Sequence, residues 1–81
     1  MHLIVQYNLD PKGSRTIFVI VDEGGDVLSI KKAIHLKTGV DIDKFIILHQ
    51  ETILTDETKI ADTNLESGDT ITIVASVPGG I

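Results

Sequence analysis

A single segment of the sequence has the periodicity of a helix, and short runs of β-branched residues lie on both sides of it. Val27, Ile30 and Ile34 are spaced so that they share one face of a helix. Asp26 precedes them as a candidate N-cap, and Gly39 follows them as a residue that readily adopts positive φ. We therefore expect one amphipathic helix of about three turns between two groups of strands.

The apolar segments outside the helix are short and rich in the β-branched residues that suit strands. Ile71 and Ile73 are expected on one face of the last strand, because side chains alternate along a strand. Thr72 and Val74 then lie on its other face. The elements predicted in chain order are strands at 2–7 and 16–21, a helix at 27–38, strands at 45–48 and 52–54, a helical turn within 59–65, and a strand at 70–75. One helix that can cover one face of a sheet predicts an α+β roll.

Charge and composition exclude several classes of function. The net charge is −5, and basic residues do not cluster beyond Lys31 and Lys32, whereas a nucleic-acid partner requires a basic face. No apolar run reaches the ~20 residues that span a bilayer, and segment 1–7 does not resemble a signal peptide. The absence of cysteine excludes disulfides and thiol chemistry, and is usual in a reducing cytoplasm. We expect one soluble cytoplasmic domain with no nucleic-acid or membrane partner.

The residues that most often carry catalysis or bind metals form no recognisable pattern. His2, His35 and His49 have no spacing typical of a zinc site and no cysteine beside them. No serine or threonine lies in a nucleophile-elbow motif. We interpret each histidine as a surface or boundary residue, and we expect no enzymatic activity, no metal and no cofactor.

The order and spacing of these segments resemble those of ubiquitin and the ubiquitin-like proteins over essentially the whole chain, with a short insertion around residues 10–13. The segments that carry the resemblance are Ile30-Lys31 to Ile34, Gly39-Val40-Asp41-Ile42-Asp43, Ile47-Leu48, the run Leu54, Asp56, Ile60, Asp62, Asn64 and Leu65, the turn at Gly68, and Pro78-Gly79-Gly80. The resemblance implies a β-grasp roll, with a mixed five-stranded sheet and one main α-helix. It assigns residues 1–76 to this domain and residues 77–81 to a flexible tail.

Several positions depart from the family pattern. The loop after Gly39 lacks the family's prolines, and Thr63 replaces a tyrosine that braces a loop. Pro78 stands before the glycines where ubiquitin has arginine. These departures indicate a distant relative rather than ubiquitin itself. The altered tail, together with the absence of the usual chain-linking lysines, favours a bacterial or otherwise divergent pathway.

The sharpest functional signal is Gly79-Gly80. In the family, the carboxylate of the last glycine is adenylated, transferred to a cysteine thioester and joined to a lysine amine. Glycine suits this chemistry because a chain without Cβ atoms can thread a narrow channel. Because Ile81 follows Gly80, the resemblance implies a precursor that a peptidase cuts at the Gly80–Ile81 bond. The alternative is a tail with no chemical role.

Activating (E1-like) and conjugating (E2-like) enzymes and target proteins would then be the partners. A second interpretation is a domain that binds other proteins without being conjugated. A third is a sulfur carrier, in which the glycine carboxylate becomes a thiocarboxylate. Such carriers usually end on the second glycine, so Ile81 counts against this interpretation.

Four residues are expected on the outer face of the sheet, by alternation with core-facing neighbours, and they are Ile46, Leu48, Thr72 and Val74. The matching positions in ubiquitin form the apolar patch that most receptors bind. Ile46 replaces an arginine, which makes the patch larger and less charged. Chance exposure of a few aliphatic residues is the alternative, since much of any protein surface is apolar.

Ile4, Phe18 and Ile20 form a third candidate site. They are out of phase with the apolar residues expected in the core, so the first hairpin would expose them. We interpret them as a second contact surface, for a partner or for self-association. An equally open alternative is that strand twist or a bulge buries part of this group.

Lysine positions matter in this family because successive ubiquitin molecules are linked to one another through lysine side chains. Thr52 and Ser67 occupy the positions of the two commonest chain-linking lysines, so chains of those kinds cannot form. Lys31 and Lys37 do fall on lysine positions, and we interpret them as a solvated helix face. Ser76 replaces an arginine that the activating enzyme reads, which implies a divergent activating enzyme.

Overall fold

The computed structural model describes residues 1–8 and 15–76. Its elements in chain order are β1 (His2–Tyr7), β2 (Arg15–Ile20), α1 (Val27–Thr38), η1 (Ile42–Lys44), β3 (Phe45–His49), β4 (Thr52–Leu54), η2 (Ile60–Asp62) and β5 (Thr70–Ala75). Every predicted element is confirmed, with bounds that agree to within a residue. The short helix η1 was not predicted.

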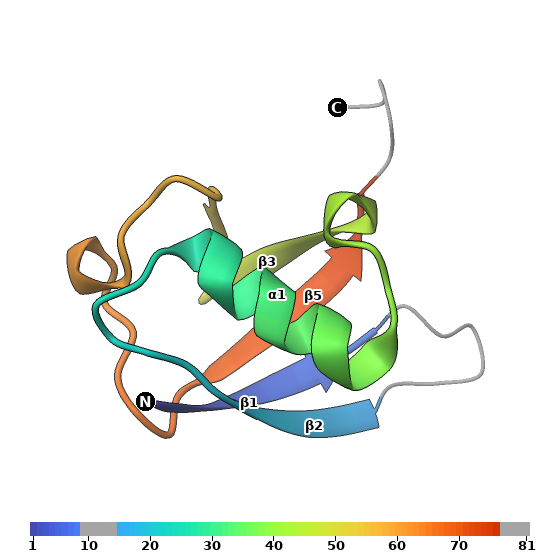
Figure 1. The fold of residues 1–81 in the computed structure, drawn as a ribbon, viewed down its shortest axis with the longest axis horizontal. Helices are drawn as coiled ribbons and strands as arrows, with labels where there is room; N and C mark the ends of the chain where they lie inside the picture. The colour runs from blue at the N-terminus through green and yellow to red at the C-terminus, as the bar shows by residue number, and fades with distance from the viewer. Residues whose placement is uncertain (9–14, 77–81) are drawn as a thin grey trace.

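The strands form one mixed sheet in the order β2-β1-β5-β3-β4. β1 and β5 are parallel, and the other neighbouring strands are antiparallel. Helix α1 crosses one face of this sheet (Figure 1). The five-stranded sheet with one main helix confirms the predicted β-grasp α+β roll.

The hydrophobic core lies between α1 and the sheet. The predicted inner face of the helix, Val27, Ile30 and Ile34, is fully buried. The alternation predicted for β5 is also confirmed, because Ile71 and Ile73 are fully buried while their neighbours are partly exposed. The other core residues are Leu3, Val5, Tyr7, Val19, Val21, Phe45, Ile47, Leu54, Ile60 and Leu65.

Both predicted ends of α1 are confirmed. The Asp26 carboxylate accepts hydrogen bonds of 3.0 Å from the Ser29 backbone N–H and hydroxyl. These two bonds lower the pKa of Asp26 below its ordinary value, because they stabilise the ionised form. At the other end, Gly39 has φ of 78°, in the left-handed region, and its N–H donates to the carbonyl of His35 at 2.7 Å.

Two interpretations made from the sequence are wrong. Lys31 does not lie on a solvated face, because it is only 6% exposed and its Nζ lies 2.8 Å from Asp56 Oδ1. His49 is buried in phase with Phe45 and Ile47 on the core side of β3, and its Nε2 lies 3.4 Å from Asp69 Oδ2. In both cases the partner carboxylate comes from a distant segment. Lys37 is exposed, as predicted.

Candidate protein-binding surface

The four residues predicted on the outer face of the sheet lie together. β3 and β5 run antiparallel, with Ile46 opposite Val74 and Leu48 opposite Thr72. All four side chains are partly exposed, while the residues between them along both strands are fully buried. We call these four residues the β3–β5 patch. The rigid core behind it fixes its shape, because the alternating neighbours anchor both strands.

The neighbouring strand β4 adds an apolar residue to the β3–β5 patch. Ile53 is paired with Leu48 and is 53% exposed. This residue was missed in the sequence analysis. The alternation in Thr52-Ile53-Leu54 would have identified it, since Leu54 is in the core.

The second predicted group lies at the opposite side of the same sheet face. Ile4 is opposite Phe18 across the β1–β2 pair, and Ile20 is opposite His2. Phe18 is 63% exposed and Ile20 is 72% exposed, whereas Ile4 is half-buried. The register of β1 and β2 runs without interruption, so no bulge hides these side chains. We call Ile4, Phe18 and Ile20 the β1–β2 patch.

Polar residues separate the two patches. Gln6 on β1 is opposite Thr16 on one side and Thr72 on the other. The Thr16 hydroxyl donates to Gln6 Oε1 at 3.4 Å. Thr72, at the border of the β3–β5 patch, thus joins Gln6 and Thr16 in placing polar side chains between the apolar residues of the two patches.

Comparison with known proteins identifies the family of the domain that carries these surfaces. The sequence matches the model of the ubiquitin family over residues 8–78. The chain belongs to the ubiquitin family. Among curated proteins, none matches the sequence significantly. The family assignment therefore supplies the domain type and leaves the specific partners open.

Thr63 stands where the ubiquitin-family pattern has a tyrosine that braces a loop. The Thr63 hydroxyl donates to the Ile60 carbonyl at 2.6 Å and accepts from the Leu65 N–H at 3.2 Å. Both partners are close in sequence. The turn after η2 is thus held by short-range hydrogen bonds from a smaller side chain.

The predicted conjugation and processing residues, Gly79, Gly80 and Ile81, lie outside the described residues. They follow β5 in the sequence. A backbone hydrogen bond joins the residue after β5 to η1. The Ser76 N–H donates to the Lys44 carbonyl at 2.9 Å. Three residues of sequence separate Ala75, the last residue of β5, from Gly79.

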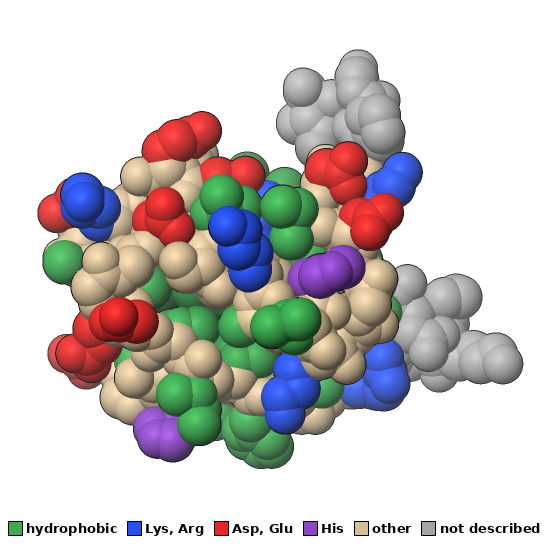
Figure 2. All heavy atoms as spheres, viewed as in Figure 1, with side chains coloured by type: hydrophobic (Ala, Val, Ile, Leu, Met, Phe, Trp, Pro, Cys, Tyr) green, Lys and Arg blue, Asp and Glu red, His purple; other side chains and the backbone are tan. Residues whose placement is uncertain are grey.

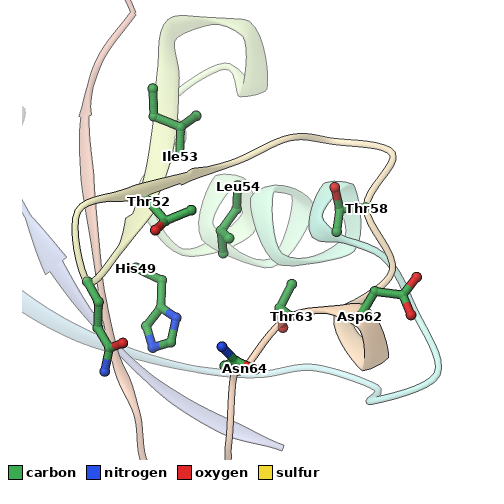
Figure 3. Close-up of a pocket in the computed structure, with 9 residues that line it drawn as sticks. His49, Thr52, Ile53, Leu54, Thr58, Asp62, Thr63 and Asn64 are labelled. Atoms are coloured by element: carbon green, nitrogen blue, oxygen red, sulfur yellow. The ribbon is translucent and has the colours of Figure 1, made fainter.

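A depression of about 310 Å³ lies between the β3–β4 turn and the segment around η2. Figure 3 shows His49 and Leu54 pointing toward the segment that carries Thr63 and Asn64. The Thr63 hydroxyl donates a hydrogen bond to the Ile60 carbonyl. The Thr58 hydroxyl forms a hydrogen bond of 2.7 Å with the Thr55 hydroxyl. Two of the three threonine hydroxyls that line the depression are therefore engaged within the domain.

Within residues 1–8 and 15–76, no group of three or more His, Cys, Asp or Glu side chains could hold a metal ion. In the same part of the chain, no helix has the length and apolar character needed to cross a membrane.

Proposed function

We propose that this ubiquitin-family domain is a protein modifier, made as a precursor that a peptidase cuts after Gly80. Activating (E1-like) and conjugating (E2-like) enzymes then join the Gly80 carboxylate to target proteins. The observation that carries the proposal is the placement of Gly79-Gly80 just beyond β5 in a chain of this family. Two residues without Cβ give the chain the slender end that a narrow enzyme channel requires.

The chemistry needs only the carboxylate from this chain. Hydrolysis of the Gly80–Ile81 bond frees it, ATP activates it as an acyl adenylate with release of pyrophosphate, and a cysteine of the activating enzyme displaces AMP. A lysine amine then displaces the thiol to form an amide. In this proposal the domain is a substrate of its partner enzymes and not an enzyme, and it acts in the cytoplasm.

The β3–β5 patch would supply recognition. Contiguous, partly exposed aliphatic side chains on a sheet suit an apolar pocket of a partner, and their core-facing neighbours hold both strands in place. This patch also supports the second candidate function, a ubiquitin-like domain that docks without being conjugated. A sulfur carrier with a Gly80 thiocarboxylate is the third candidate.

Intact mass spectrometry of the N-terminally tagged chain, recovered from its native cells, tests the proposal. We expect a species that ends at Gly80 and heavier species joined through it. Gly80→Ala should abolish both. Gly24→Ala is the matched control, since a Cβ at Gly24 meets only an ordinary contact at 3.4 Å. A chain that keeps Ile81 and forms no adducts would refute conjugation and favour the docking domain.

A further inference from the structure

The two edges of the sheet differ in how they are protected. β4, at one edge, is three residues long, which is too short to template another strand. β2, at the other edge, is six residues long and carries no charged residue from Thr16 to Ile20. Long apolar edge strands pair readily with further strands unless they are covered or charged.

The hydrogen bonds at the start of the β1–β2 pair show which backbone groups of β2 face outward. Met1 and Val21 exchange two bonds of 2.9 Å, one in each direction. Bonded and non-bonded pairs alternate in an antiparallel ladder, so Val19 and Ile17 also direct their backbone groups toward β1. The N–H and C=O groups of the alternate residues, Thr16, Phe18 and Ile20, therefore point to the free edge.

Apolar side chains lie on both sides of this edge. The exposed Phe18 and Ile20 are on the outer face of the sheet. On the helix side, Leu36 is 86% exposed beside a groove of about 260 Å³ that is lined by Val19, Ile20, Ala33, Leu36 and Lys37. Figure 2 shows hydrophobic side chains along the edge where Figure 1 places β2. A strand added here would bury apolar surface on both faces.

The charges at the two ends of β2 indicate which strand would pair with its free edge. Exposed Arg15 begins the strand, and exposed Asp22 and Glu23 follow its end. Two copies of β2 placed antiparallel bring the basic end of each next to the acidic end of the other. Opposite charges placed in this way favour the antiparallel orientation and fix the register. The strand is thus complementary to itself.

We propose that β2 pairs antiparallel with β2 of a second copy of this chain, about a twofold axis at Phe18. In this register Phe18 is opposite Phe18, and Thr16 is opposite Ile20. All the outward N–H and C=O groups of these residues then form hydrogen bonds, and two aromatic rings meet across the axis. The interface is isologous, so it closes as a dimer with one continuous sheet.

Sedimentation equilibrium of the full chain, from micromolar to millimolar concentration, tests this pairing. We expect the mass to rise from one chain to two. Phe18→Lys should raise the dissociation constant about tenfold or more, because it places a charge at the centre of the edge. Ile53→Lys is the matched control, a similarly exposed residue on the other edge strand, and it should leave the dissociation constant unchanged.

Two further readouts separate pairing through β2 from unspecific association. Arg15→Glu should weaken the dimer, and Arg15→Glu combined with Glu23→Arg should restore it. Amide hydrogen exchange at Thr16, Phe18 and Ile20 should slow as the protein concentration rises, while Ile17 and Val19 change little. A chain that stays monomeric at every concentration, or equal weakening by Phe18→Lys and Ile53→Lys, would overturn the proposal. Neither result would bear on conjugation through Gly80.

Discussion

Lys31 Nζ lies 2.8 Å from Asp56 Oδ1, and this ion pair joins α1 to the segment that follows β4. The same segment satisfies the first N–H groups of the helix. Val27 donates to the Thr58 carbonyl at 2.9 Å, and Leu28 donates to the Asp56 carbonyl at 3.1 Å. Helix N-termini leave such groups unpaired, so this segment completes a cap that Asp26 only begins.

The ion pair predicts an asymmetric response to mutation. The Lys31 side chain is 8% exposed and that of Asp56 is 43% exposed. Asp56→Ala should therefore cost about 1–3 kcal/mol, because it leaves a buried ammonium without its partner. Lys31→Met keeps the apolar stem and leaves only a solvated carboxylate, so it should cost less than about 1.5 kcal/mol. Urea unfolding of both variants measures the difference.

The double variant Lys31→Met with Asp56→Ala provides the control for this prediction. It should be more stable than Asp56→Ala alone, since no buried charge remains unpaired. Equal stability of these two variants would show that the pair contributes nothing through its charge.

The β3–β4 turn predicts a stabilising mutation. Gln50 and Glu51 both have positive φ, of 51° and 70°, which side chains with a Cβ disfavour. Glu51→Gly should raise the free energy of unfolding by about 0.5–1 kcal/mol, because relief of this strain exceeds the entropic cost of glycine. Glu51→Val should lower it. Gly39→Ala, at φ of 78°, should also destabilise. A less stable Glu51→Gly would contradict the turn geometry.

Asp26 predicts a specific dependence of stability on pH. Its pKa is lowered in the folded state by hydrogen bonds from Ser29, so the folded protein favours the ionised carboxylate. The resulting stabilisation is fully present above the ordinary value of 3.8 and is lost as pH falls through the lower folded-state pKa. Asp26→Asn keeps an N-cap but cannot titrate. Thermal unfolding between pH 2 and 7 should show a weaker acid dependence for Asp26→Asn, and an unchanged profile would contradict this role.

The β3–β5 patch predicts loss of partner binding without loss of folding. Leu48→Asp places a charge at the centre of the patch, opposite Thr72 and beside Ile53. Recovery of proteins bound or joined to the tagged chain should fall about tenfold or more. Thr52→Asp is the control, since Thr52 is exposed on β4 and outside the patch. Equal recovery with both variants would remove the patch from the binding surface.

The local sequence determined the elements of this protein and their ends. Helix 27–38 follows from the spacing of Val27, Ile30 and Ile34, and its limits from Asp26 and Gly39. The alternation in the last strand identified which residues face outward. These features depend on neighbours along the chain, so periodicity and capping preferences suffice to predict them. The mixed sheet itself was expected only from the resemblance to the ubiquitin family.

Tertiary structure alone decided which segments meet. Nothing local to β1 or β5 specifies that they pair in parallel, or that β2 and β4 become the edges. Burial of Lys31 and His49 depends on Asp56 and Asp69, each far away in sequence. A charged or polar residue can be buried when a distant segment supplies its partner, and that partner exists only once the chain has folded.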